Sequence, residues 1–153
     1  MDPASLIQPI LGANACNRRF STRELAVTHQ IETYTKRIGN EDRRLIRRIY
    51  ADYTSTMEVE MPDNSEPVYR LRSIEVTGPG LRLAGGLTIG TGYAEFANRF
   101  RLPAPASKGE APPRIQSMSN YRSVNGVATG TNLTIFTNED ETVAKILLLC
   151  TAH

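Results

Sequence analysis

The chain has 153 residues, a length that predicts a single domain able to bury a sizeable core. Hydrophobic residues make up 40% of it and charged residues 22%, which is typical of a globular protein. A net charge of +2 is too small to indicate a nucleic-acid-binding protein by itself. The start of the chain has no basic segment before an apolar run, so we expect neither a secretory signal nor a membrane span.

The two cysteines are too few for a disulfide framework. Cys16 and Cys150 also lack the paired spacing of a zinc site. We therefore expect reduced thiols and no metal or other cofactor, in a cytoplasmic protein. Residues 1–20 mix proline and glycine with short apolar pieces, which indicates an arm that can pack on a neighbour.

Two helices are expected after this arm. Ser21 and Glu24 have the spacing of a capping box, and apolar residues at roughly helical spacing continue to Arg37. Gly39 would end this helix and Asn40 would cap the second one. One face of the second helix would be apolar, and the other would carry Arg43, Arg44, Arg47 and Arg48. The arginines form either a solvated face or an RNA-binding face, and the lack of an aromatic platform favours the solvated face.

Strands and turns are expected in the middle of the chain. Alternation over 56–61 predicts a strand with Glu58 on its polar side. The β-prone stretch 68–76 carries several charged residues, which is typical of an exposed edge strand. A glycine-rich stretch then predicts turns with at most two short strands, at 81–83 and 87–89.

The last third of the chain predicts a helix, a loop and an antiparallel sheet. Aromatic residues at helical spacing predict a third, short helix that ends near Arg101. The proline-rich stretch 103–113 predicts a surface loop. Two β-prone runs, 114–124 and 127–137, are joined by Asn125-Gly126, a strong hairpin signal.

A final strand, expected over 142–151, is apolar enough to be buried on both faces. This order of elements resembles the cone-shaped superfamily of nuclear transport factor 2, ketosteroid isomerase and the SnoaL-like polyketide cyclases, best over 31–60. The resemblance implies an α+β, cystatin-like cone in which a curved mixed or antiparallel sheet wraps around about three helices. It also implies one domain over 21–153 with an unusual insertion at about 66–89, and a homodimer.

The resemblance implies a site as well. Aligned without a gap with ketosteroid isomerase, Tyr34 matches the tyrosine that donates to the substrate oxyanion and Glu58 matches the carboxylate that moves the proton. The isomerase's second oxyanion donor, an aspartate, would fall near Leu149 or Cys150, where no acid stands. The substrate-binding residues added by the resemblance are Asp42, Gln116, Asn120 and Phe96.

The chemistry of this pair also follows from the residue types. A carboxylate inside a curved sheet is desolvated, which raises its pKa toward the range of a general base, and a phenol opposite it can donate to an enolate. Tyr34 and Glu58 then predict a cofactor-independent isomerase, cyclase or lyase that acts on a small apolar carbonyl compound of secondary metabolism. The alternative is a noncatalytic binding or association module that dimerises through its open sheet face. In that case Glu58 would lie on a solvent-facing strand side.

Overall fold

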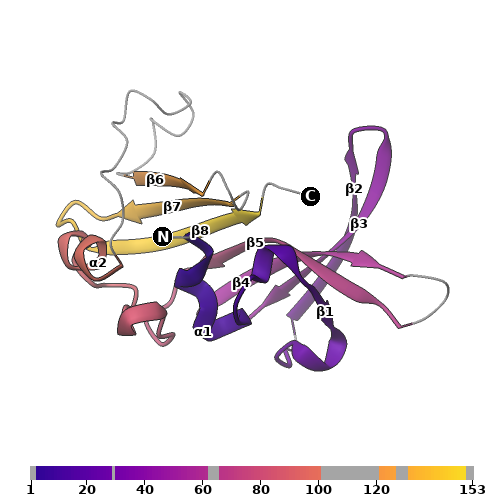
Figure 1. Cartoon of the computed structure of the whole chain (residues 1–153), viewed down its shortest axis with the longest axis horizontal. Coiled ribbons are helices and arrows are strands. Elements are labelled where there is room, and N and C mark those ends of the chain that lie inside the picture. Colours follow the sequence, from indigo (N-terminus) through magenta and orange to yellow (C-terminus); the bar gives the residue numbers. More distant parts are fainter. Residues whose placement is uncertain (1–2, 29, 62–65, 101–120, 127–130, 151–153) are drawn as a thin grey trace.

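The protein is built around one antiparallel sheet (Figure 1). The computed structural model describes residues 3–28, 30–61, 66–100, 121–126 and 131–150. The strands are β1 (Arg19–Ser21), β2 (Gln30–Ile38), β3 (Glu41–Ile49), β4 (Tyr53–Glu60), β5 (Val68–Val76), β6 (Tyr121–Gly126), β7 (Thr131–Thr137) and β8 (Val143–Cys150). Their order is β2-β3-β4-β5-β8-β7-β6, and β1 pairs with the part of β5 that β8 leaves uncovered.

The predicted fold, a sheet wrapped around about three helices, is wrong. In the part of the chain that the structure describes, the α-helices are α1 (Gln8–Leu11) and α2 (Tyr93–Phe100). The other helical segments are short 3-10 turns: η1 (Pro3–Ile7), η2 (Ala15–Asn17), η3 (Thr22–Glu24) and η5 (Ala84–Gly86). Neither α-helix is long enough to fill the interior of a cone, so the sheet itself organises the core.

The first expected helix, 21–37, ends after one turn. The capping box forms as predicted, and the Ser21 amide donates to Glu24 Oε1 at 3.0 Å. Leu25 is already extended, with φ −91° and ψ 135°, and β2 follows. The helical spacing of apolar residues gave a wrong prediction here. In β2, β-branched residues alternate with polar ones, and branching at Cβ favours a strand.

The second expected helix is β3, the partner of β2 in a hairpin. Ile38 pairs with Glu41, so Gly39-Asn40 is a two-residue turn, and Gly39 takes a φ of +63° that glycine adopts without strain. Gly-Asn between two β-prone runs is a hairpin signal that helical periodicity obscured. Because a strand alternates, the arginines do not share a face: Arg43 and Arg47 lie on one side of the sheet, Arg44 and Arg48 on the other.

The middle of the chain follows the predictions more closely. The expected strands at 56–61 and 68–76 are confirmed as β4 and β5, but β5 lies at the centre of the sheet and is not an edge strand. The glycine turns are confirmed, whereas the short strands at 81–83 and 87–89 are absent from the described residues. The segment read as an insertion, 66–89, therefore contributes the central strand.

The expected third helix is confirmed as α2, and the last strand is confirmed as β8. The predicted burial of β8 on both faces is wrong, since Leu148 is fully buried while Leu149 is 37% exposed. Asn125-Gly126 lies within β6 and does not form the turn. The loop predicted over 103–113 lies outside the described residues.

The hydrophobic core of the described residues lies on one face of the sheet. The N-terminal arm covers this face, and its residues Leu6 and Ile7 are fully buried, so the arm packs on its own sheet. Phe96 of α2 closes another part of the same core and is also fully buried. A disulfide joins Cys16 to Cys150 and fixes the arm to β8, so the expectation of free thiols is wrong. Among the described residues no helix or further strand covers the opposite face of the sheet, which we call the open face.

Candidate functional site

The open face of the sheet carries a shallow groove of about 470 Å³. The strand register explains most of its lining, because directly paired residues point to the same side. The exceptions are the consecutive Arg72 and Ser73, next to a β-bulge, and Cys150, which is bonded to Cys16 in the core. Its lining residues are Tyr34, Lys36, Ile38, Leu45, Arg47, Thr56, Arg72, Ser73, Leu149 and Cys150. A second groove of about 410 Å³ adjoins it and shares Arg47, Thr56 and Ser73 with it. Together they follow the sheet from β2 to β8.

The charged side chains that line the first groove are cationic. Lys36, Arg47 and Arg72 line it, and no acidic side chain among the described residues does. Arg47 lies over the Tyr34 ring at 5.5 Å and pairs with Glu32 at 3.0 Å. Lys36 forms no ion pair with any described residue.

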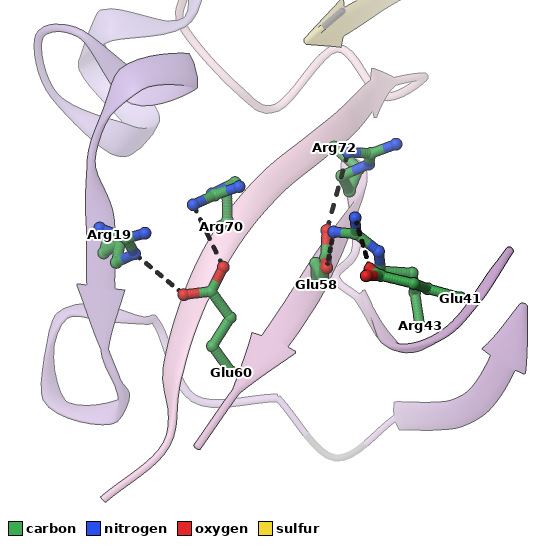
Figure 2. Close-up of polar contacts among 7 residues, drawn as sticks. All are labelled: Arg19, Glu41, Arg43, Glu58, Glu60, Arg70 and Arg72. Atoms are coloured by element: carbon green, nitrogen blue, oxygen red, sulfur yellow. Dashed lines mark hydrogen bonds and ion pairs between the residues drawn. The ribbon is translucent and has the colours of Figure 1, made fainter. Parts of the chain in front are cut away.

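Glu58 lies beside this groove, buried under arginine side chains. Its side chain is 5% exposed, and Arg43 Nη1 donates to Glu58 Oε1 at 2.6 Å. Glu58 Oε2 faces Arg72 Nη1 at 3.7 Å, beyond hydrogen-bond distance (Figure 2). The hydrogen bond to Glu58, and then the negative charge of Glu58, raise the pKa of the Arg43 guanidinium above its usual value. Glu58 is thus held as an ion-pair partner.

Glu60 repeats this arrangement two residues along β4. Arg19 Nε contacts Glu60 Oε2 at 3.0 Å, and Arg70 Nη2 contacts Glu60 Oε1 at 3.2 Å (Figure 2). Arg43 also reaches Glu41 at 3.1 Å, so ion pairs to the two glutamates of β4 come from β1, β5 and β3. The sequence held a signal for this network: acids alternate on one strand and arginines on the next.

Tyr34 and Glu58 share the open face but do not meet. Tyr34 pairs with Leu45, and Leu45 pairs with Glu58, so Leu45 lies between them. Strands lie about 4.8 Å apart, which places the Cα atoms of Tyr34 and Glu58 about 10 Å from each other. The two side chains therefore lie side by side on one surface, and do not face each other across an interior.

The remaining predicted residues are not brought to this pair. Asp42 lies near the tip of the β2–β3 hairpin, exposed, with its Oδ1 3.5 Å from Arg37 Nη1. Phe96 is fully buried in the core on the other face of the sheet. Gln116 and Asn120 lie outside the described residues.

Within the described residues no group of three or more His, Cys, Asp or Glu side chains is placed to hold a metal ion. Nor does any described helix have the length and apolar character to cross a membrane.

Comparisons with known proteins do not extend this picture. No protein-family model, no curated protein and no solved structure matched the chain. The resemblance to the cone-shaped superfamily stays a prediction without a match, and the site must be interpreted from its own geometry.

Proposed function

We propose that this chain is a noncatalytic binding protein that holds a small anionic amphiphile, such as a fatty-acid carboxylate, on the open face of its sheet. The observation that carries the proposal is the charge of the groove: three cationic side chains line it, and no described acidic side chain does. An anion is the ligand class that such a lining attracts.

The polar side of the groove has unused hydrogen-bond donors. A guanidinium carries five N–H donors, and Arg72 uses none of them for a hydrogen bond to Glu58, since their contact is 3.7 Å long. A carboxylate headgroup beside Arg47 and Arg72 would therefore gain charge-assisted hydrogen bonds, which are stronger than those between neutral groups.

The apolar side of the groove suits a hydrocarbon body. Ile38, Leu45 and Leu149 line it, and the adjoining groove adds Ile49 and Leu147. Covering an exposed leucine such as Leu149 removes apolar surface from water, which contributes about 25 cal/mol per Å². Arg47 lines both grooves and Glu75 lines the adjoining one, so the apolar residues lie beside charged ones, and one ligand with a charged head and an apolar tail can contact both kinds.

The contacts of Glu58 favour this function over proton transfer. A general base needs a carboxylate oxygen within reach of a substrate proton. Glu58 Oε1 instead accepts a hydrogen bond from Arg43, and Glu58 is not among the residues that line the groove. Proton transfer by Tyr34 and Glu58 stays a hypothesis that no contact supports.

The disulfide adds a proposal about compartment. Structural disulfides form and persist in oxidising surroundings and are rare in the cytosol. The Cys16–Cys150 bridge therefore favours an oxidising compartment over the cytoplasm expected from the sequence.

Calorimetric titration with decanoate, and with decanol as its uncharged counterpart, tests the binding function. We expect decanoate to bind, decanol to bind about tenfold more weakly or worse, and the difference to shrink with added salt. Arg47→Gln should weaken decanoate binding about tenfold, because a hydrogen bond to a charged group contributes about 1.5–3 kcal/mol.

Arg44→Gln is the matched control, since Arg44 lies on the same strand with its side chain on the other face. We expect this variant to bind decanoate like the original chain. Equal losses of decanoate affinity in both variants, or no heat of binding with decanoate, would contradict the proposal that this groove binds the ligand.

A further inference from the structure

The outer edge of β2 is an unused pairing surface. β2 ends the sheet, and no described strand pairs with its far side. The β2–β3 hairpin also stands out from the body of the protein (Figure 1), because β4 pairs with β3 only from Leu45 onward. No described strand therefore pairs with this edge anywhere along its length.

The hairpin turn determines which backbone groups face outward. Ile38 and Glu41 flank a two-residue loop, so they exchange hydrogen bonds, as does every second residue of β2 counted back from Ile38. On the other side of β3, the Tyr50 amide donates to the Tyr53 carbonyl at 2.9 Å, which fits this alternation. The outward N–H and C=O groups of β2 thus belong to Ile31, Thr33, Thr35 and Arg37.

This edge is complementary to itself. When two β2 strands run antiparallel about a two-fold axis at Tyr34, the midpoint of the strand, Thr33 of each copy faces Thr35 of the other. Ile31 faces Arg37 in the same way, so all the outward groups find partners. On the open face, Glu32 lies opposite Lys36 on both sides of the axis, and opposite charges at directly paired positions stabilise a sheet.

We propose that two copies of this chain associate through β2, antiparallel and centred on Tyr34, so that the two sheets become one continuous sheet. A second copy of the chain is the partner that fits this edge, because its charges are complementary to those of the first copy. Such an isologous contact closes on itself and leads to a dimer, not to a fibre.

The neighbouring registers fit less well. A two-fold axis at Thr33 places Tyr34 opposite Glu32 and Lys36 opposite Gln30, which removes both opposite-charge pairs. An axis at Thr35 places Lys36 opposite Tyr34 with the same loss. Both also shorten the overlap of the nine-residue strand. The axis at Tyr34 is thus preferred by charge and by length.

The dimer brings the two grooves together. Tyr34 and Lys36 line the groove of each copy at the β2 end. The axis at Tyr34 would place these residues of both copies next to each other, so the two grooves would run into one another across the junction. The pairing itself depends on backbone and charge, and does not require a ligand.

Variants with a reversed charge on β2 test the pairing, and sedimentation detects the dimer by its mass. We expect the original chain to be a dimer in sedimentation over about 10 μM to 1 mM, the range suited to a small interface. Glu32→Lys alone and Lys36→Glu alone should each raise the dissociation constant about tenfold or more, since both ion pairs become like-charge pairs. An equimolar mixture of the two variants should form a heterodimer, because each introduced charge then faces its opposite.

Three outcomes would overturn the proposal: a monomer at every concentration, single variants that associate like the original chain, or a mixture that stays monomeric. Circular dichroism and melting temperature show that each variant is folded, and both replaced side chains are exposed.

Cross-linking tests the register. At the axis the two Tyr34 Cα atoms would lie about 4.5 Å apart, within the span of a disulfide. Mild oxidation of Tyr34→Cys should therefore give a covalent dimer. Lys36→Cys is the control, because its Cα atoms would lie about 14 Å apart, too far to bridge. Cross-linking at 36 but not at 34 would show that the register is wrong. Neither assay depends on decanoate, so the dimer and the binding function succeed or fail separately.

Discussion

The two faces of the sheet differ although the same strands build both. On β8, Leu148 is fully buried in the core, whereas its neighbour Leu149 is 37% exposed in the groove. On β4, Met57 is 1% exposed in the core, whereas Thr56 lines the groove. The apolar face holds the fold together, and the charged face is the one for which we propose a role in recognition. Alternation along a strand thus lets each position serve one role with little effect on the other.

Each face has an exception, and both involve arginine. On the open face, Glu58 and Leu45 are 4% exposed, so a small buried patch exists there beneath Arg43 and Arg72. On the core side, Arg48 is 8% exposed and donates to the Ala26 carbonyl at 3.2 Å. The separation of the faces is therefore strong at the centre of the sheet and weaker toward β3.

Truncating neighbouring leucines should give the largest contrast between the faces. Leu148→Ala removes a fully buried side chain and should cost about 2–5 kcal/mol of the free energy of unfolding. Leu149→Ala should cost less than about 1 kcal/mol, because its side chain is already partly in water. Urea denaturation of both variants measures the difference. Similar losses would mean that the open face is packed in solution, for instance by another chain.

Removing the disulfide should have the next largest effect. The bridge joins residues 134 positions apart, and loss of a native disulfide costs about 2–5 kcal/mol in a small domain. For a chain of this size that predicts a fall in melting temperature of about 5–15 °C on reduction or in Cys16→Ser. The control is Cys16→Ser with and without reductant, which should melt alike. An unchanged melting temperature would show that the arm holds to the sheet without the bridge.

A smaller contrast is expected between the two glutamates of β4. Glu58→Gln leaves Arg43 and Arg72 without their buried partner, and we expect a loss of about 1–3 kcal/mol. Glu60→Gln should cost less than about 1 kcal/mol, because the Glu60 side chain is 29% exposed and water can replace it. Chemical denaturation at neutral pH compares the two. A loss at Glu60 as large as that at Glu58 would remove the distinction between buried and solvated ion pairs on this face.

The sequence determined some elements of the fold and left others ambiguous. The strands β4, β5 and β8 and the helix α2 were predictable, because apolar and β-branched residues recur there with a clear period. The hairpin β2–β3 was misjudged because its apolar spacing fits a helix as well as a strand. Its Gly39-Asn40 turn would have decided the matter in favour of the hairpin. The spacing of apolar residues thus predicted an element correctly only where it fitted one kind of element, a strand or a helix, and not both.

The candidate site was harder to predict than the fold. Alternation placed Glu58 on the polar side of its strand, and this is confirmed by its register with Arg70. Which arginines would cover Glu58 depends on the register of β4 with its two neighbouring strands, and the alternation of acids and arginines along each strand does not determine that register. The same is true of the groove, whose lining comes from β2, β3, β4, β5 and β8.

The bridge between Cys16 and Cys150 makes a closed covalent ring of nearly the whole described fold. A protease that cuts the chain once inside this ring, for example in the turn between β3 and β4, leaves a single connected molecule. Force applied before Cys16 and after Cys150 would pass through the bridge and bypass the sheet. The ring would have to be broken before pulling could unzip a strand.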